Sequence, residues 1–306
     1  MSNEQLPVSS NHLITNTCPG SSTLQSKGII RRLTNVLIRK VALALFFCLI
    51  LHPLTAQVTV CSRNLQDFGQ SKSDESIAFI ANTVKAFDIV CIQEVVAGPG
   101  GTQAVARLAD ALNRKGAKWD YATSEPTSGN NSYKKERYAF LWKPSKVKLT
   151  GAPWLEVLYT VEIDREPYFA TFESKGILFT LVNFHAITKD NQPETEIKYF
   201  KFLPAEYPEM NLIFVGDFNL PQSHTVFNPL RSMGYKPIFT GRKTSLKQEC
   251  VSDICLASEF DNIFYNSTKI KWLDSGTINF YESFPSLKDA RSLSDHIPVW
   301  FQFSIN

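Results

Sequence analysis

The sequence predicts one mixed α/β domain that follows an N-terminal targeting segment. Strand-like and helix-like segments alternate from residue 58 to residue 306 without a linker, a repeat or a low-complexity tract. The composition is that of a globular protein, with 43% hydrophobic and 20% charged residues. A length of about 250 residues is compatible with one domain of this class. We therefore divide the chain into residues 1–56 and residues 57–306.

Residues 1–56 have the layout of a secretory signal peptide. Basic side chains at positions 31, 32, 39 and 40 precede an apolar run over 41–51, and small residues then lead to Ala56. The run is shorter than the about 20 residues that span a bilayer, and a membrane anchor or a buried helix is the alternative. We expect cleavage after Ala56, and a secreted or periplasmic monomer without stable membrane association.

The net charge does not by itself indicate a nucleic-acid-binding protein. The formal charge of the whole chain is +3, but residues 1–56 contribute five basic side chains against Glu4 alone, which leaves −1 for residues 57–306. Attraction to phosphate would therefore have to come from a local patch or from bound cations.

Hydrophobic periodicity predicts the elements of residues 57–306 in order. Alternating or unbroken apolar runs predict strands at 58–63, 88–95, 119–124, 137–143, 168–173, 177–184, 211–217, 260–265 and 298–303. Apolar faces with helical spacing predict helices at 73–87, 102–115, 195–202 and 225–233. Ser73 or Asp74 is expected to cap the first helix, and Gly116 to end the second.

The cysteines of residues 57–306 fall into two kinds. Cys61 and Cys91 lie in apolar strand-like runs, where a cysteine is usually a small buried hydrophobe. Cys250 and Cys255 lie close together in a polar loop, and in an oxidising compartment we expect them to form a small disulfide. Their spacing, without a second pair or nearby histidines, is a poor zinc site.

Polar side chains stand at the ends of five apolar strands, where loops expose them at the rim of a sheet. Each of them taken singly is more often a structural cap or a solvated strand end. Together they bring carboxylates, imidazoles and side-chain amides within reach of one site. They are Asn64, Glu94, His185, Asp217, Asn219, Asp295 and His296.

This set of groups suits phosphodiester hydrolysis. Hard oxygen ligands such as Glu94 and Asp295 suit Mg²⁺ or Mn²⁺, and imidazoles transfer protons near pH 7. The amides of Asn64 and Asn219 can hydrogen-bond phosphate oxygens without adding charge. Zinc is less favoured, because the histidines lack close paired spacing and no cysteine belongs to the set.

Six short motifs follow one another along residues 58–306: N-L-Q-D-F-G, I-Q-E-V, S-Y-K-K-E-R-Y, V-N-F-H, G-D-F-N and S-D-H-I-P-V. This series resembles the endonuclease/exonuclease/phosphatase superfamily, and residues 124–141 and 165–167 resemble its deoxyribonuclease I branch. The resemblance implies a four-layered sandwich of two packed mixed β-sheets flanked by helices, with the site at one rim. It also implies a metal-dependent endonuclease that hydrolyses DNA by in-line attack of water and leaves 5′-phosphate and 3′-hydroxyl ends.

The resemblance further implies a role for each matched residue. His185 would pair with Glu136, and His296 with Asp261, but which histidine is the base and which the acid stays open. The implied catalytic residues are Glu136, His185, Asp217, Asn219, Asp261 and His296; the implied substrate-binding residues are Asn64, Tyr133 and Arg165; and the implied ligands of Mg²⁺ or Mn²⁺ are Glu94, Asp295 and Asn64.

The chain departs from the branch at several positions. Gln66 and the run 96–101 stand where the pancreatic-type enzymes carry arginines that touch phosphate, and an extra lysine separates Tyr133 from Glu136. The segment 159–165 is too short for the calcium-binding loop of that branch, so Ca²⁺ binding stays open. DNA or RNA preference also stays open.

Two other functions are compatible with the same residues. Another member of the superfamily would hydrolyse sphingomyelin, inositol phosphates or abasic DNA, and residues 280–285 would then be a candidate apolar contact with lipid. A non-catalytic binding protein on this scaffold would lack one or more catalytic groups, and none is missing here. A carbohydrate hydrolase is less favoured, because it would not need two histidines and two asparagines.

Overall fold

The computed structural model describes residues 37–41, 57–129 and 135–305. The chain divides into two compact units, Met1–Leu54 and Thr55–Asn306. In the first unit residues 37–41 are helical, and the rest of the predicted signal peptide lies outside the described residues. Among the described residues no helix has the length and hydrophobicity needed to cross a membrane.

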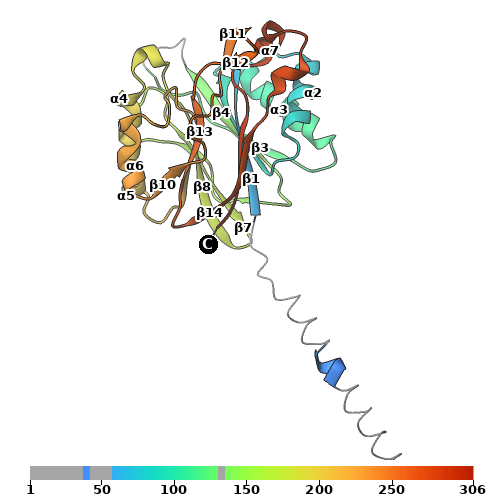
Figure 1. The fold of residues 1–306 in the computed structure, drawn as a ribbon, viewed down its shortest axis with the longest axis vertical. Helices are drawn as coiled ribbons and strands as arrows, with labels where there is room; N and C mark the ends of the chain where they lie inside the picture. Colours follow the sequence, from blue (N-terminus) through green and yellow to red (C-terminus); the bar gives the residue numbers. More distant parts are fainter. Residues whose placement is uncertain (1–36, 42–56, 130–134, 306) are drawn as a thin grey trace, which may run out of the picture. The chain divides into compact units, whose positions relative to one another are not determined.

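Two large sheets form the centre of the second unit (Figure 1). The six-stranded sheet has the order β14-β15-β1-β2-β4-β3, and the seven-stranded sheet has the order β10-β13-β9-β8-β7-β5, with β6 paired to β7. The first consists of β1 (Gln57–Phe68), β2 (Ile89–Val96), β3 (Asp120–Thr123), β4 (Glu136–Trp142), β14 (Ile270–Thr277) and β15 (Val299–Ile305). The second consists of β5 (Lys148–Leu149), β6 (Trp154–Leu155), β7 (Tyr168–Ser174), β8 (Ile177–His185), β9 (Leu212–Asp217), β10 (Tyr235–Pro237) and β13 (Asp261–Asn266).

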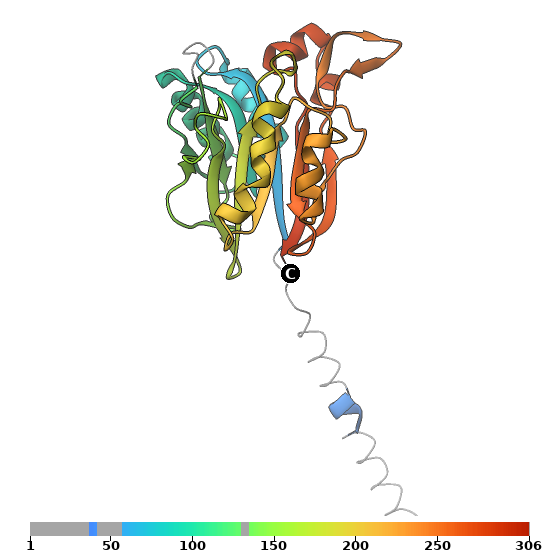
Figure 2. The same cartoon turned by 90° about the vertical axis from the view of Figure 1, so that its left-hand side faces the viewer.

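Helices cover the outer face of each sheet, which gives four layers (Figures 1 and 2). The six-stranded sheet carries α2 (Asp74–Val84), α3 (Pro99–Asn113), η5 (Phe280–Ser283) and α7 (Leu287–Leu293). The seven-stranded sheet carries α4 (Glu194–Ile197), η3 (Lys198–Lys201), α5 (Leu203–Glu206), η4 (Thr225–Phe227) and α6 (Asn228–Ser232). The short helix η2 (Lys189–Asn191) follows β8 without contributing a buried residue. The expected four-layered α/β sandwich is therefore confirmed.

Three apolar clusters separate these layers. Side chains from both sheets, such as Val60, Phe172 and Val215, share one cluster and bind the sheets face to face. A second cluster joins the six-stranded sheet to its helices, and a third, rich in phenylalanine, joins the seven-stranded sheet to its own. Cys61 and Cys91 are buried and free, as expected.

Two parallel strand pairs, one in each sheet, bring polar residues to one rim. In the six-stranded sheet β1 runs parallel to β2, and Asn64 lies opposite Gln93, next to Glu94. In the seven-stranded sheet β8 runs parallel to β9, and Asp217 lies opposite both His185 and Asp261. Because parallel strands end at the same edge, residues far apart in the sequence become neighbours.

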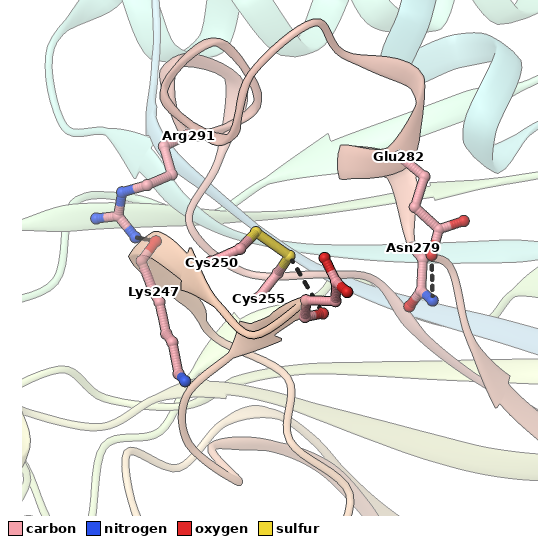
Figure 3. The surroundings of a disulfide bond; sticks show 7 residues. Lys247, Cys250, Cys255, Asn279, Glu282 and Arg291 are labelled. Atoms are coloured by element: carbon pink, nitrogen blue, oxygen red, sulfur yellow. Dashed lines mark hydrogen bonds between the residues drawn. A yellow bond between two sulfur atoms is a disulfide. The ribbon is translucent and has the colours of Figure 1, made fainter.

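Some local expectations were wrong. Asn64 lies inside β1, not at its end, because the strand continues through a register shift to Phe68. The helices expected at 195–202 and 225–233 are each divided into an α-helical and a 3₁₀ part. The loop expected around Cys250 is a hairpin of β11 (Leu246–Val251) and β12 (Ile254–Leu256), and it contains the expected disulfide to Cys255 (Figure 3).

Phe200 supplies a test of the phenylalanine-rich layer. Its ring is fully buried, with centroids 4.6 Å from Phe184 and 5.3 Å from Phe214. Phe200→Ala should lower the free energy of unfolding by about 3–5 kcal/mol, because it leaves a cavity in a packed core. Urea denaturation would measure this loss. Phe202→Ala is the matched control, since Phe202 is 42% exposed, and equal losses in the two variants would contradict the packing described here.

Candidate active site

An open pocket of about 900 Å³ lies at the rim where the two parallel strand pairs end. Asn64 and Asp261 do not line it but are hydrogen-bonded to residues that do. Tyr133 lies outside the described residues. Eight of the sequence-predicted site residues line the pocket: Glu94, Glu136, Arg165, His185, Asp217, Asn219, Asp295 and His296.

Asn64 connects the two sheets beneath the residues that line this pocket. Its Nδ2 donates to Glu94 Oε1 at 2.8 Å in its own sheet and to Asp217 Oδ2 at 3.2 Å in the other sheet. Glu94 has a φ of 59°, an uncommon conformation for this residue type, at a point where the pairing of β2 with β4 shifts register. At this interruption of the regular strand pairing, the Glu94 carboxylate lies within hydrogen-bonding distance of Asn64.

Glu136 and His185 form the first carboxylate–imidazole pair. His185 Nδ1 lies 2.9 Å from Glu136 Oε2, and Arg165 Nη1 donates to the same oxygen at 3.0 Å. Burial and the Arg165 guanidinium oppose protonation of His185, but the carboxylates of Glu136 and Glu94 outweigh them, so the pKa of His185 is raised. Burial would raise the pKa of Glu136, but His185 and Arg165 lower it overall.

Arg165 is held from within the protein. Besides Glu136, its guanidinium donates to the backbone oxygen of Ala186, directly after His185. The side chain is buried yet still lines the pocket. Arg165 therefore fixes the first pair, and its expected contact with substrate stays a prediction.

Asp261 and His296 form the second pair. His296 Nδ1 lies 2.7 Å from Asp261 Oδ2 and 3.5 Å from Asp217 Oδ2. Burial opposes protonation of His296, but Asp261 and Asp217 outweigh it and raise its pKa well above the usual value. The pairing strands β9 and β13 place the two aspartates side by side, which accounts for their closeness.

Asp217 lies between the two pairs. Its Oδ2 is 3.6 Å from His185 Nε2, and its Oδ1 accepts from the backbone N–H of Asn219 at 2.9 Å. Burial would raise the pKa of Asp217, but His296 and His185 lower it overall, which favours the carboxylate. Asn219 Nδ2 donates to Ala186 O at 3.0 Å, so this amide is fixed beside the first pair.

The oxygen atoms near Glu94 fit a hard divalent cation. Burial is the main cause of the raised pKa of Glu94, with Glu136 adding to it, and a bound cation would offset both effects. Asp295 lines the same pocket, and carboxylate oxygens are the ligands that Mg²⁺ and Mn²⁺ prefer. The amide oxygen of Asn64 accepts from the backbone N–H of Gln66 at 3.0 Å, so the role of Asn64 and Asp295 as ligands stays a prediction. Asp217, Asp261 and His296 also lie close enough to surround an ion, but Nδ1 of His296 already bonds Asp261 there.

Several supporting residues were not expected from the sequence. Lys72 Nζ donates to the backbone oxygens of Ser292 and Leu293 at the end of α7, and Ser294 Oγ donates to Asn64 O at 2.7 Å. These bonds tie the segment that carries Asp295 and His296 to strand β1. A single lysine or serine in a polar stretch carries no sequence signal for such a role, because the contact depends on residues more than two hundred positions away.

Glu196 is a second unexpected support. Its carboxylate accepts from the backbone N–H of Ile187 at 2.6 Å and of Asp164 at 3.1 Å. Ile187 follows His185 by two positions and Asp164 immediately precedes Arg165, so one buried side chain fixes both loops. Burial raises the pKa of Glu196 to about 7.

The second pair predicts a titration that can be measured in the metal-free protein. Asp261→Asn should lower the pKa of His296, because only Asp217 and Asp295 then oppose the effect of burial. Since the folded-state pKa is raised, the pair stabilises the fold below the unfolded value of about 6.5 and ceases to do so as the pH rises through the folded-state pKa. Histidine NMR titration would measure the shift. Asp274→Asn is the control on exposed β14, and an unchanged His296 pKa in Asp261→Asn would contradict the pairing.

Sequence comparison agrees with this geometry. Residues 64–296 match the model of the Endonuclease/Exonuclease/phosphatase family. A deoxyribonuclease of Thioalkalivibrio sp. (strain K90mix) is 28% identical over 293 residues, which cover 88% of this chain and 78% of that protein. Human deoxyribonuclease gamma is 30% identical over 196 residues, or 59% of this chain and 62% of that protein.

Solved structures share the fold at lower identity. The human Nocturnin catalytic domain superposes with a TM-score of 0.58 at 17% identity, covering 83% of this chain and 96% of that one. TDP2 of D. rerio, in complex with a single-strand DNA product, has a TM-score of 0.58 at 16% identity, with coverages of 81% and 99%. On its sequence, its architecture and the motifs gathered at the rim, the chain belongs to the endonuclease/exonuclease/phosphatase family, in its deoxyribonuclease I-like branch.

Proposed function

We propose that this protein is a secreted endonuclease that hydrolyses DNA with the help of Mg²⁺ or Mn²⁺. The observation that carries the proposal is the meeting of two carboxylate–imidazole pairs on either side of Asp217 in one pocket. Relatives that are named deoxyribonucleases support the coarser assignment to a nuclease-type phosphodiesterase. DNA as the substrate, the metal and export are the finer parts of the proposal.

The residues of the pocket can carry out in-line hydrolysis. One imidazole accepts a proton from water as the water oxygen bonds to phosphorus, and the other donates a proton to the departing 3′-oxygen. The carboxylate at Nδ1 of each ring keeps the opposite nitrogen available and stabilises the imidazolium. The bond from phosphorus to the 3′-oxygen breaks, so the products carry a 5′-phosphate and a 3′-hydroxyl.

Asp217 and Asn219 would position the reactants. Asp217 lies within 3.6 Å of both rings and favours the carboxylate form, so it can accept a hydrogen bond from the attacking water. The fixed amide of Asn219 can donate to a phosphate oxygen. Glu94, Asp295 and Asn64 would hold the cation, which when bound offsets negative charge on the phosphate.

The packing of residues 280–285 gives no support to a lipid substrate. Phe280 is buried, and Phe284 is partly buried against the same core cluster. Their ring centroids lie 5.9 Å apart, and Phe79 of α2 stacks edge-on to both. We therefore place the nuclease ahead of a sphingomyelin-hydrolysing enzyme.

Export is proposed on two grounds. Basic residues before the apolar run 41–51 are the signal-like feature of the sequence, and the disulfide Cys250–Cys255 is compatible with an oxidising compartment. Sequencing the N-terminus of the protein from the culture medium would test it, with residue 57 as the expected first residue.

Plasmid nicking tests the proposed reaction. The 57–306 protein should convert supercoiled plasmid to open circles with Mg²⁺ or Mn²⁺, and EDTA should abolish this. His185→Ala should slow nicking at least about 10²-fold, because it removes a proton-transferring group. His224→Ala is the matched control, since His224 only caps η4 outside the pocket.

The opposite outcome would be equally informative. A folded 57–306 protein that leaves plasmid intact under every metal condition would contradict the DNA assignment. Inositol phosphates and sphingomyelin would then be the substrates to assay, with the same His185→Ala and His224→Ala variants.

Metal binding can be tested without activity. Mg²⁺ should raise the melting temperature of the wild-type protein by mass action, since it binds the folded site. Glu94→Gln should reduce this rise, because it removes a charged ligand from the oxygen set. Glu209→Gln, an exposed change away from the pocket, should keep the full rise. Equal Mg²⁺-induced rises in all three proteins would exclude Glu94 as a ligand.

A further inference from the structure

The β11–β12 hairpin belongs to neither main sheet. It forms a two-stranded sheet of its own and lies beside α7 at the rim of the second unit (Figures 1 and 2). Cys250 and Cys255 join its strands near the tip, and the residues at the tip are exposed. Its base, from Ser245 to Gln248, lines the catalytic pocket.

The base of the hairpin is bonded directly to the catalytic segment. Leu246 N–H donates to the backbone oxygen of Asp295 at 2.7 Å, and Ser245 forms a backbone bridge with His296. Arg291 of α7 donates to the backbone oxygen of Leu246 at 2.7 Å. The first residues of β11 therefore have a fixed position relative to the second carboxylate–imidazole pair.

Lys247 is the cation that this base presents to the pocket. In Figure 3 its side chain points away from Arg291 and from the disulfide. Within the described part of the chain it forms no ion pair. The two arginines that line the pocket differ, because Arg165 is bonded to Glu136 and Arg291 is held by backbone oxygens near Asp295.

A cation without a carboxylate partner on the pocket wall can compensate the negative charge of a bound phosphate. Within the described ranges, six carboxylates and five lysines and arginines line the pocket. The phosphate charge of a nucleic-acid backbone that enters it must therefore be compensated by cations that no carboxylate already holds. A lysine provides a mobile point charge that suits a phosphate without fixing its orientation. Because Lys247 stands on the wall, outside the two pairs, the phosphate in reach would be a neighbour of the scissile one.

We propose that Lys247 binds a backbone phosphate next to the scissile phosphate, and that the disulfide-closed hairpin is one arm of the nucleic-acid groove. This inference rests on the proposed function. It implies that the Lys247 side chain contributes to the binding of a polymer and contributes nothing to the hydrolysis of a small diester.

Kinetics on two substrates test the proposal. Lys247→Gln should raise KM for duplex DNA about three- to tenfold and leave kcat within about twofold, because one phosphate contact is lost. Hydrolysis of bis(4-nitrophenyl) phosphate should be unchanged. Lys247→Arg should restore most of the DNA KM, and Lys271→Gln, at an exposed position on β14, is the matched control.

Binding measured in EDTA separates charge from catalysis. The slope of log affinity for duplex DNA against log salt should fall by about 1 in Lys247→Gln and stay unchanged in Lys271→Gln. Equal behaviour of the two variants on DNA, or an equal loss on DNA and on the small diester, would overturn the proposal. A wild-type protein that does not cleave DNA would instead count against the proposed function.

Discussion

The buried carboxylate of Asp217 is the charge on which the arrangement of the site depends. A buried carboxylate is costly unless hydrogen bonds and opposite charges surround it. Asp217 obtains them from the Asn64 amide, the Asn219 N–H and the two nearby imidazoles. The strand that carries Asp217 lies beside β8, which ends in His185, while Asn64 and His296 come from the six-stranded sheet and from the segment that leads into it. The charge of Asp217 is therefore compensated only when the two sheets are packed in their correct relative position.

The site is a product of the whole fold and not of one local motif. The two pairs lie on different strands and loops, and each is fixed by a separate support: Arg165 and Glu196 behind His185, Lys72 and Ser294 behind His296. These supports are buried polar groups with their own partners, which is the condition under which such networks stabilise one arrangement. Loss of the supports behind one imidazole would displace that ring, a proposed proton donor or acceptor, and leave the other imidazole in place.

The sequence predicts the sheet rim well and its details less well. Alternating apolar runs located the central strands, and the polar residues that follow them proved to share one pocket, because parallel strands end together. Strand β14 was missed, since an edge strand that is largely exposed lacks an apolar pattern. The bend at Glu94 and the contacts of Lys72 were not predictable either. The first needs a register shift in the ladder, and the second joins segments far apart in the chain.

The position of β15 between β14 and β1 in the six-stranded sheet has a consequence for synthesis. β15 pairs with β1, so the first and last strands of the unit are neighbours, and Asp295 and His296 immediately precede β15. Until residues 295–305 have emerged from the ribosome, a nascent chain lacks Asp295, the second imidazole and the strand that joins β1 to β14. The proposed activity could therefore arise only after residues 295–305 had emerged and folded, which would protect the cell that makes the protein during translation.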